Sequence, residues 1–311
     1  MGQLKLALME HRRRRSQIQS RICLKIPCLK RLSSLEVSAC NRLQVIESKA
    51  PNLSYFSFGG NPHVQLPLGG TSPIKKLSVS YNDAVFYART ELPSRLPNLE
   101  ALIIFSHPEA VNTPMVNSKF LHLKFLHIIL GGRDYDFLSL VSFFDASPSL
   151  ENFRLTVIRA YEEPNSIFLD PLDLRTVPGH LYYKLKFVEI INFSSAKSLI
   201  ELTCHILGST RSLERLTLDT TQGFARCSVS KSGKCLLMHK DTLVEAGRAL
   251  VSVETYIKPN RDGEDDVVGG PAPATKKTNA MNKAVRKCKS TLEEVDVSQL
   301  ETPRLRGKSL P

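Results

Sequence analysis

The chain has 311 residues, 42% of them hydrophobic, and its 42 Lys and Arg outnumber its 30 Asp and Glu to give a formal net charge of +12. The hydrophobic fraction excludes a chain that is disordered throughout. No apolar run reaches about 18 residues, so we expect no membrane-spanning helix. The seven cysteines are irregularly spaced and form no Cys-x-x-Cys pair, so we expect a reduced, intracellular protein of the nucleus, the cytoplasm or both.

The basic excess lies at the two ends of the chain. Residues 1–31 carry nine basic and one acidic side chains, and residues 258–311 carry eleven and eight, so the segment between them is nearly neutral. We therefore predict three parts. These are a basic, disordered N-terminal extension over 1–21, a folded region over 22–257 and a flexible basic tail over 258–311.

Clusters of basic residues in both ends are typical of nuclear import signals. A solvated tail is the alternative, and contacts with phosphate backbones are a second one. Neither cluster interleaves aromatic residues with its bases, which weakens the nucleic-acid interpretation, so we rank a nucleic-acid partner below a protein partner. The basic residues concerned are Arg12, Arg13, Arg14, Arg15, Lys276, Lys277, Arg286, Lys287 and Lys289.

The central region repeats a pattern of three apolar residues, L-x-x-L-x-L. The clearest copy runs from Leu32 to Leu43 and reads L-x-x-L-x-V-x-x-C-x-x-L. A proline two residues before several copies favours an extended entry into a strand. The copies start at residues 32, 53, 74, 99, 123, 150, 185 and 213. Eight copies in order predict an α/β fold, a leucine-rich-repeat solenoid with parallel strands on its concave face and turns, then helices, on its convex face.

The spacing between copies grows along the chain, which leaves room for convex helices in the later repeats. Asp134 or Asp136 is the expected cap of the first of these helices, and Ser195 that of the second. The first three repeats have room only for turns or a short 3₁₀ segment. Apolar residues recur at helical spacing over 137–144, 199–207 and 243–250.

Two stretches resemble the repeat region of plant F-box/leucine-rich-repeat proteins: IPCLKRLSSLEVSACNRLQVIESKAPNLSYFSFGG and KLKFVEIINFSSAKSLIELTCHILGSTRSLERLTLDT. The second stretch, within about 180–257, is similar to the FBD type of C-terminal module, in which a strand, a helix and another L-x-x-L-x-L strand follow in order. The resemblance implies that the repeats recognise the substrate of an SCF-type E3 ubiquitin ligase, while an F-box near the N-terminus binds the ligase adaptor.

This sequence departs from that family pattern, because no F-box precedes the first repeat and the chain contains no Trp. We therefore expect adaptor binding only where an F-box is supplied by sequence outside this chain. Two alternatives to the ubiquitin-ligase role remain. One is a stand-alone interaction or scaffold protein with no ubiquitin link, and the other is association with nucleic acid through the basic ends.

The third, fifth and seventh residues of each copy are expected to face the concave surface, since side chains alternate along a strand. In the middle repeats these residues are unusually apolar, and exposed apolar patches tend to mark partner sites. We therefore predict a protein-binding surface there. The alternatives are a loop or tail that covers the patch, and a strand register that is one residue off. The predicted binding residues are Tyr55, Lys76, Ile103, Phe105, Phe125, His127, Ile129, Arg154, Phe187, Glu189, Ile191 and Arg215.

We expect neither enzymatic activity, nor a cofactor, nor a metal site. The sequence contains no G-x-S-x-G, no H-E-x-x-H and no phosphate-binding loop. His122 and His127 are expected to point to opposite faces of one strand. Cys227, Cys235 and His239 lie near one another in the sequence but lack zinc-finger spacing.

Overall fold

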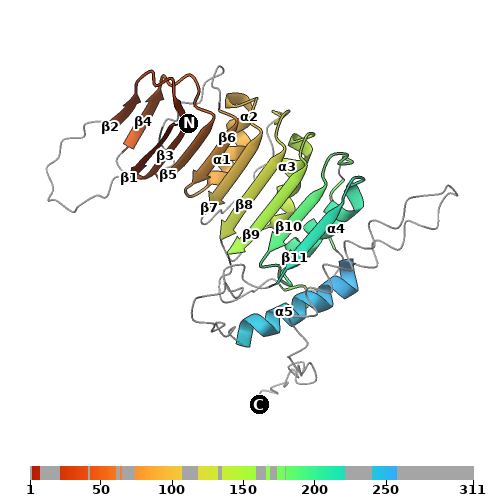
Figure 1. The fold of residues 1–311 in the computed structure, drawn as a ribbon. Coiled ribbons are helices and arrows are strands. Elements are labelled where there is room, and N and C mark those ends of the chain that lie inside the picture. The colour runs from red at the N-terminus through yellow and green to blue at the C-terminus, as the bar shows by residue number, and fades with distance from the viewer. Residues whose placement is uncertain are drawn as a thin grey trace, which may run out of the picture.

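The computed structural model describes residues 2–7, 22–40, 43–60, 64, 74–106, 118–131, 135–158, 166–168, 174–178, 180–220 and 240–257. Nine strands of this part of the chain form one parallel sheet (Figure 1). In spatial order they are β1 (Gly2–Ala7), β3 (Leu32–Cys40), β5 (Tyr55–Gly60), β6 (Lys76–Ser80), β7 (Ala101–Ser106), β8 (Phe125–Gly131), β9 (Asn152–Ile158), β10 (Phe187–Ile191) and β11 (Arg215–Asp219).

The strands stack in the register that the repeat pattern predicts. The middle apolar residue of each copy pairs with its equivalent in the next strand, and every member of this row is buried. One repeat cannot bury such a face, so the stacked neighbours form the core together. The predicted leucine-rich-repeat solenoid is therefore confirmed. The row consists of Leu35, Phe56, Leu77, Leu102, Leu126, Phe153, Val188 and Leu216.

The sheet begins earlier than the sequence pattern indicated. Residues 1–21 were predicted to lack regular structure, but Gly2–Ala7 form β1, which pairs in parallel with β3 and places Leu4 beside Leu35. The expectation is wrong for this strand, because its backbone pairs with β3 and covers an edge that would otherwise be unpaired. Residues 8–21 lie outside the described part of the chain.

A second, two-stranded parallel sheet consists of β2 (Ile22–Ile26) and β4 (Leu43–Ser48). Its buried residues Ile26, Leu43 and Ile46 join the same hydrophobic core as the inward residues of β3 and β5. Strands, rather than helices, therefore cover the core beside the first repeats.

Helices cover the buried face of the later strands, except for the last helix, which lies beyond the ends of the last strands (Figure 1). They follow β6, β8, β10 and β11, and none of the described helices is long and apolar enough to cross a bilayer. Their bounds are α1 (Ala84–Thr90), α2 (Leu92–Arg95), the 3₁₀ helix η1 (Phe137–Leu140), α3 (Val141–Ala146), α4 (Lys197–Ser209), α5 (Lys240–Ser252) and the π-helical turn η2 (Val253–Ile257).

The three predicted helical segments are confirmed, with two corrections. The third repeat was expected to hold only turns or a short 3₁₀ segment, but α1 and α2 fold there because Ala84, Val85 and Ala88 bury one helical face. The predicted cap of α4 is also wrong. The N-cap is Ala196, and the preceding residue, Ser195, donates its backbone N–H to Glu245 of α5 instead.

Candidate protein-binding face

The side chains opposite the core form three rows that cross the sheet, because paired residues of parallel strands stack over one another. All twelve predicted binding residues lie in these rows, so the register alternative is wrong for the described strands. The first row is Ser34, Tyr55, Lys76, Ala101, Phe125, Asn152, Phe187 and Arg215. The second is Glu36, Ser57, Ser78, Ile103, His127, Arg154, Glu189 and Thr217. The third is Ser38, Gly59, Ser80, Phe105, Ile129, Thr156, Ile191 and Asp219.

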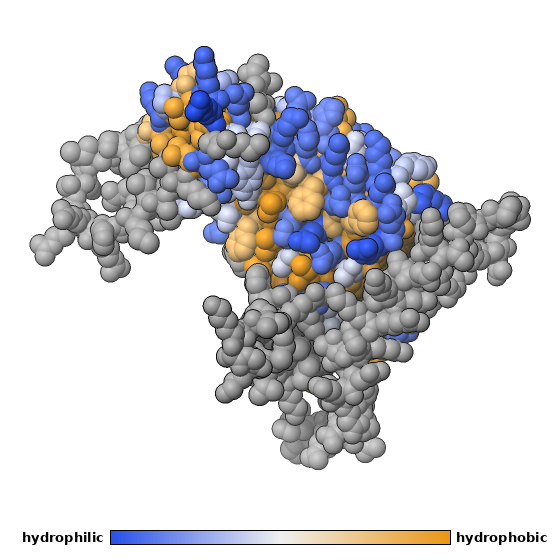
Figure 2. All heavy atoms as spheres, viewed as in Figure 1, coloured by the Kyte–Doolittle hydropathy of each residue, from blue (hydrophilic) through white to orange (hydrophobic). Residues whose placement is uncertain are grey.

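Apolar residues gather in the middle of this face, as Figure 2 shows, but they form two patches rather than one track. The first apolar patch consists of Ile103, Phe105, Phe125 and Ile129, on β7 and β8. The second apolar patch consists of Phe187 and Ile191, on β10.

A polar strand separates the two apolar patches. β9 presents Asn152, Arg154 and Thr156 to the face, and each pairs with a residue of β8 on one side and of β10 on the other. The residues of the first apolar patch are half-buried, while Phe187 is 37% exposed. Both patches therefore keep solvent-accessible apolar surface on a rigid parallel sheet.

His127 lies between the residues of the first apolar patch and is held by the polar strand. Its Nε2 is 3.1 Å from the Thr156 hydroxyl oxygen, Oγ1. Burial, and then the nearby positive charge of Arg154, lower the pKa of His127 to about 4. His127 is therefore neutral near pH 7 and adds no charge to the patch.

Two arginines of the face contact a neighbouring carboxylate or an aromatic ring. Arg154 of β9 forms an ion pair with Glu189 of β10, with 2.6 Å between Nη2 and Oε2. The guanidinium of Arg215 lies over the Phe187 ring, 5.9 Å from its centroid, in cation–π geometry. These contacts fix the long side chains around the second apolar patch.

The sequence prediction missed a line of charges at the edge where the strands begin. The residue just before each of the strands β6 to β11 alternates in sign. These six residues, here called the charged edge, are Lys75, Glu100, Lys124, Glu151, Lys186 and Glu214.

Backbone hydrogen bonds align the members of the charged edge, since from Glu100 on each backbone N–H donates to the carbonyl of the preceding member. Lys75 pairs with Glu100 at 2.8 Å, and Lys186 with Glu214 at 3.7 Å. The hydrogen bond from Lys75 lowers the pKa of Glu100. The alternation is visible in the sequence once the repeats are aligned on their first apolar residue. Because its charges largely cancel, the edge adds little net charge to the face.

The comparisons place the fold in a family. The family model described as At1g61320/AtMIF1, LRR domain, matches residues 16–262, which is most of the chain. The chain belongs to this plant leucine-rich-repeat family. The domain supports a protein-interaction module. No curated protein matches the chain with significant sequence similarity.

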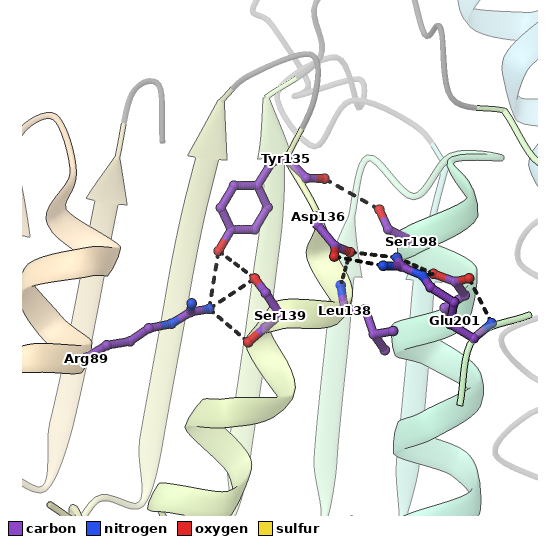
Figure 3. Close-up of polar contacts among 8 residues, drawn as sticks. Arg89, Tyr135, Asp136, Leu138, Ser139, Ser198 and Glu201 are labelled. Atoms are coloured by element: carbon purple, nitrogen blue, oxygen red, sulfur yellow. Dashed lines mark hydrogen bonds and ion pairs between the residues drawn. The ribbon is translucent and has the colours of Figure 1, made fainter. Parts of the chain in front are cut away.

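The convex side of this leucine-rich-repeat domain holds buried polar contacts that the sequence did not predict. Arg89 of α1 is 1% exposed, and Figure 3 shows it reaching Tyr135 and Ser139. It donates to the Ser139 carbonyl at 2.9 Å and to the hydroxyls of Ser139 and Tyr135 at 3.2 and 3.4 Å. Its guanidinium also lies 5.2 Å from the Phe143 ring centroid. Arg89 thus ties the helix of one repeat to the helix of a later one.

Arg175 links the N-cap of η1, Asp136, to Glu201 of α4. Figure 3 labels these two carboxylates. Arg175 donates two hydrogen bonds to the Asp136 carboxylate, at 2.8 and 3.0 Å, and two to Glu201 Oε2, at 2.6 and 2.9 Å. The two carboxylates, Asp136 first, raise the pKa of Arg175. Asp136 also accepts the N–H of Leu138, which confirms the predicted cap.

A third cluster joins α3 to α4. The hydroxyl of Tyr182 donates to Asp145 at 2.9 Å and lies 3.0 Å from Nε2 of His205. Burial, and then Asp145, raise the pKa of Tyr182, so this phenol stays protonated. Each of these groups contacts other parts of the solenoid, so we assign the convex clusters to stability rather than to binding.

Several predicted residues lie elsewhere. His122 precedes β8 and is exposed, so it does not share a strand with His127. The basic clusters at 12–15 and 276–289, and the residues Cys227, Cys235 and His239, lie outside the described part of the chain. Within that part, no three His, Cys, Asp or Glu residues are grouped so as to hold a metal ion.

Proposed function

We propose that this chain is a non-enzymatic recognition module whose concave face, from β7 to β10, binds a protein partner. The carrying observation is the pair of apolar patches on a sheet whose other face is fully used by the core. Clustered apolar and aromatic residues with nearby arginine are typical of the residues that dominate binding energy in protein interfaces. A parallel sheet holds them rigidly, so little ordering entropy opposes binding.

The resemblance to plant F-box/leucine-rich-repeat proteins supports a more specific role. In this role the partner is the substrate of a ubiquitin ligase, and the adaptor binds through an F-box supplied outside this sequence. We propose that it acts inside the cell, in the nucleus or the cytoplasm. The family match supports only the repeat domain of this scheme.

Capture experiments on the full chain test the binding face. Phe125→Asp and Phe187→Asp should each reduce partner capture by about tenfold or more, because they place a charge in an apolar contact. Leu121→Asp is the matched control, because Leu121 is 54% exposed and lies before β8, outside the three rows. Circular dichroism and thermal unfolding establish that the variants are folded. Equal capture by folded wild type and both concave variants refutes the proposal.

A second experiment tests the ubiquitin link. The chain as given should not bind the ligase adaptor, whereas a product extended by an upstream F-box exon should. If the genomic sequence upstream encodes no F-box, the stand-alone interaction protein is the correct alternative. Binding to nucleic acid that falls steeply with salt and requires residues 1–21 would instead favour the tail-mediated role.

A further inference from the structure

The length of the two apolar patches along their strands indicates how wide the partner segment that covers them must be. Phe125 and Ile129 lie four residues apart on β8, and Phe187 and Ile191 four apart on β10, so each patch extends about 13 Å along its strands. An extended chain laid across the strands covers only about 5 Å of that length. An α-helix with its side chains is about 10–12 Å wide and covers most of it.

The positions of the patches define the direction of the occupant. The first apolar patch lies on β7 and β8, the second on β10, and the polar strand β9 separates them. A segment that contacts both patches must therefore cross the strands. Neighbouring strands are about 4.8 Å apart, so β8, β9 and β10 lie roughly 5, 10 and 14 Å from β7.

This spacing matches the stripe of an amphipathic helix. Residues at i, i+3, i+7 and i+10 lie on one helical face at rises of about 4.5, 10.5 and 15 Å from the first. A helix that crosses the sheet therefore places one residue of this stripe over each successive strand. Its residues at i, i+3 and i+10 meet β7, β8 and β10, while the residue at i+7 meets β9.

The charged residues of the concave face indicate which residues of the helical stripe should be polar. Exposed cations of the face occur on β6, β9 and β11, as Lys76, Arg154 and Arg215. Among the face residues of these three strands the one anion is Asp219, which is buried, and Glu189 of the neighbouring β10 pairs with Arg154. An acidic helix residue is therefore favoured at i−4, i+7 and i+14, opposite these three strands.

We infer that the partner segment is an amphipathic helix that lies across β6–β11, with apolar residues at i, i+3 and i+10 and acidic residues at i−4, i+7 and i+14. This inference rests on the proposed function, since it names the class of segment that the same face binds. Recognition then follows the helix-in-groove mode, with a sheet in place of a groove. The helix can run in either direction, which gives the pattern and its reverse.

Synthetic helical peptides test the inference with the full chain. A labelled peptide of roughly 23 residues carries the stripe, and Glu–Lys pairs four apart on its outer face keep it helical. A second peptide carries the reversed stripe. A third has the same composition and helicity but spreads the apolar residues around the helix. Fluorescence anisotropy should show that one of the first two binds about tenfold or more tightly than the third.

Two variants locate the contact. Phe187→Ser should weaken the better peptide about tenfold, while Leu121→Ser should change its affinity less than about twofold. Replacing the acidic residue at i+7 by lysine should weaken binding several-fold to wild type, and this difference should shrink in Arg154→Gln. A double-mutant cycle measures that coupling.

The outcomes separate this inference from the proposed function. Equal binding of the striped and spread peptides, or no saturable binding up to about 1 mM, overturns the helical occupant. If Phe125→Asp and Phe187→Asp nevertheless abolish capture of the native partner, the concave face binds a segment of another kind. If those variants also leave capture intact, both the face and the helix are wrong.

Discussion

In the first repeats, up to β5, the concave face carries small polar residues such as Ser34 and Ser57, and the core is covered by the strands β2 and β4. In the later repeats the same face carries aromatic and branched residues on β7, β8 and β10, and helices cover the core. The two regions also differ inside. Every buried polar side chain among the described residues comes from residue 89 or later.

This difference shows what repeats of unequal length require. The first repeats have equal spacing, so stacked apolar rows are enough to align them. The later repeats carry insertions of different lengths, and apolar contact is not directional. Hydrogen bonds are directional, and those from Arg89 and Arg175 each fix the orientation of one convex helix relative to another. The later region is therefore the one that buried polar substitutions should destabilise.

The largest effect should come from Arg89→Ala. It leaves a cavity and removes the donor to the Ser139 carbonyl and the Tyr135 hydroxyl, so we expect a loss of about 3–5 kcal/mol in the free energy of unfolding. Urea unfolding measures it. Arg95→Ala, which breaks only a surface pair with Glu91, should cost less than about 0.5 kcal/mol. Equal losses for the two variants would contradict the assigned role of Arg89.

Arg175→Ala should rank second, with a loss of about 2–4 kcal/mol, because it leaves the fully buried carboxylate of Glu201 without its cation. The first repeats offer a matched control. Lys25 pairs with Glu47 at 3.7 Å between two exposed side chains, so Lys25→Ala should cost less than about 0.5 kcal/mol. Chemical denaturation of both variants, compared at the same pH, measures the contrast. Similar losses would show that burial does not distinguish the two regions.

Asn192→Ala should cost about 2–3 kcal/mol, since Asn192 has a left-handed φ of 59° and its amide donates to the Val157 carbonyl at 2.7 Å. Asn192→Gly should be more stable than Asn192→Ala by about 1 kcal/mol, because glycine adopts the left-handed φ without strain. The first repeats contain the same kind of bond, from Asn52 to the Lys30 carbonyl, but it is exposed. Asn52→Ala should therefore cost about 0.5 kcal/mol or less in thermal unfolding. A larger loss there would reverse the order of the two regions.

The smallest effect concerns pH and His127. Its pKa is about 4 in the folded chain and near 6.5 when unfolded, so the unfolded state binds more protons as the pH falls. Stability should then decrease by about 1 kcal/mol between pH 7 and pH 5, after allowance for solvent screening. The described early repeats contain no histidine.

Urea unfolding of wild type and His127→Gln at pH 7 and pH 5 isolates this part of the pH dependence. The variant should lose less stability than wild type on acidification. A remaining slope is expected in both, because burial also lowers the pKa of His205. If the two proteins respond identically to pH, His127 does not titrate as the structure indicates.

The apolar repeat pattern was sufficient to predict the solenoid, the register of β3 to β11 and the placement of the concave residues. It was sufficient because side-chain alternation and repeat stacking depend only on residue spacing. The division of the apolar face was less apparent, since residues of β9 such as Arg154 become a barrier only when β9 is known to lie between β8 and β10. Whether the face binds a partner stays a prediction.

The contacts of the buried Arg89 and of the exposed Arg175 could not be predicted from spacing. Arg89 and Arg175 lie in segments of ordinary polarity, and a charged residue is by default assigned to the surface. Tyr135 lies 46 residues after Arg89, and Glu201 lies 26 residues after Arg175. Only the folded chain therefore brings each arginine to its partner. The strand β1 was missed for another reason, because it lacks the full repeat pattern and precedes a basic cluster.

The charged edge has a consequence for how the solenoid can lengthen or shorten. Deleting the single repeat that contains Lys124 would bring Glu100 beside Glu151, and like charges directly opposite each other destabilise a sheet by about 0.2–1 kcal/mol. Deleting two consecutive repeats, those of Lys124 and Glu151, would bring Glu100 beside Lys186 and preserve the alternation. Electrostatics therefore favours gain or loss of these repeats in pairs, because only an even number preserves the alternation of charge along the edge.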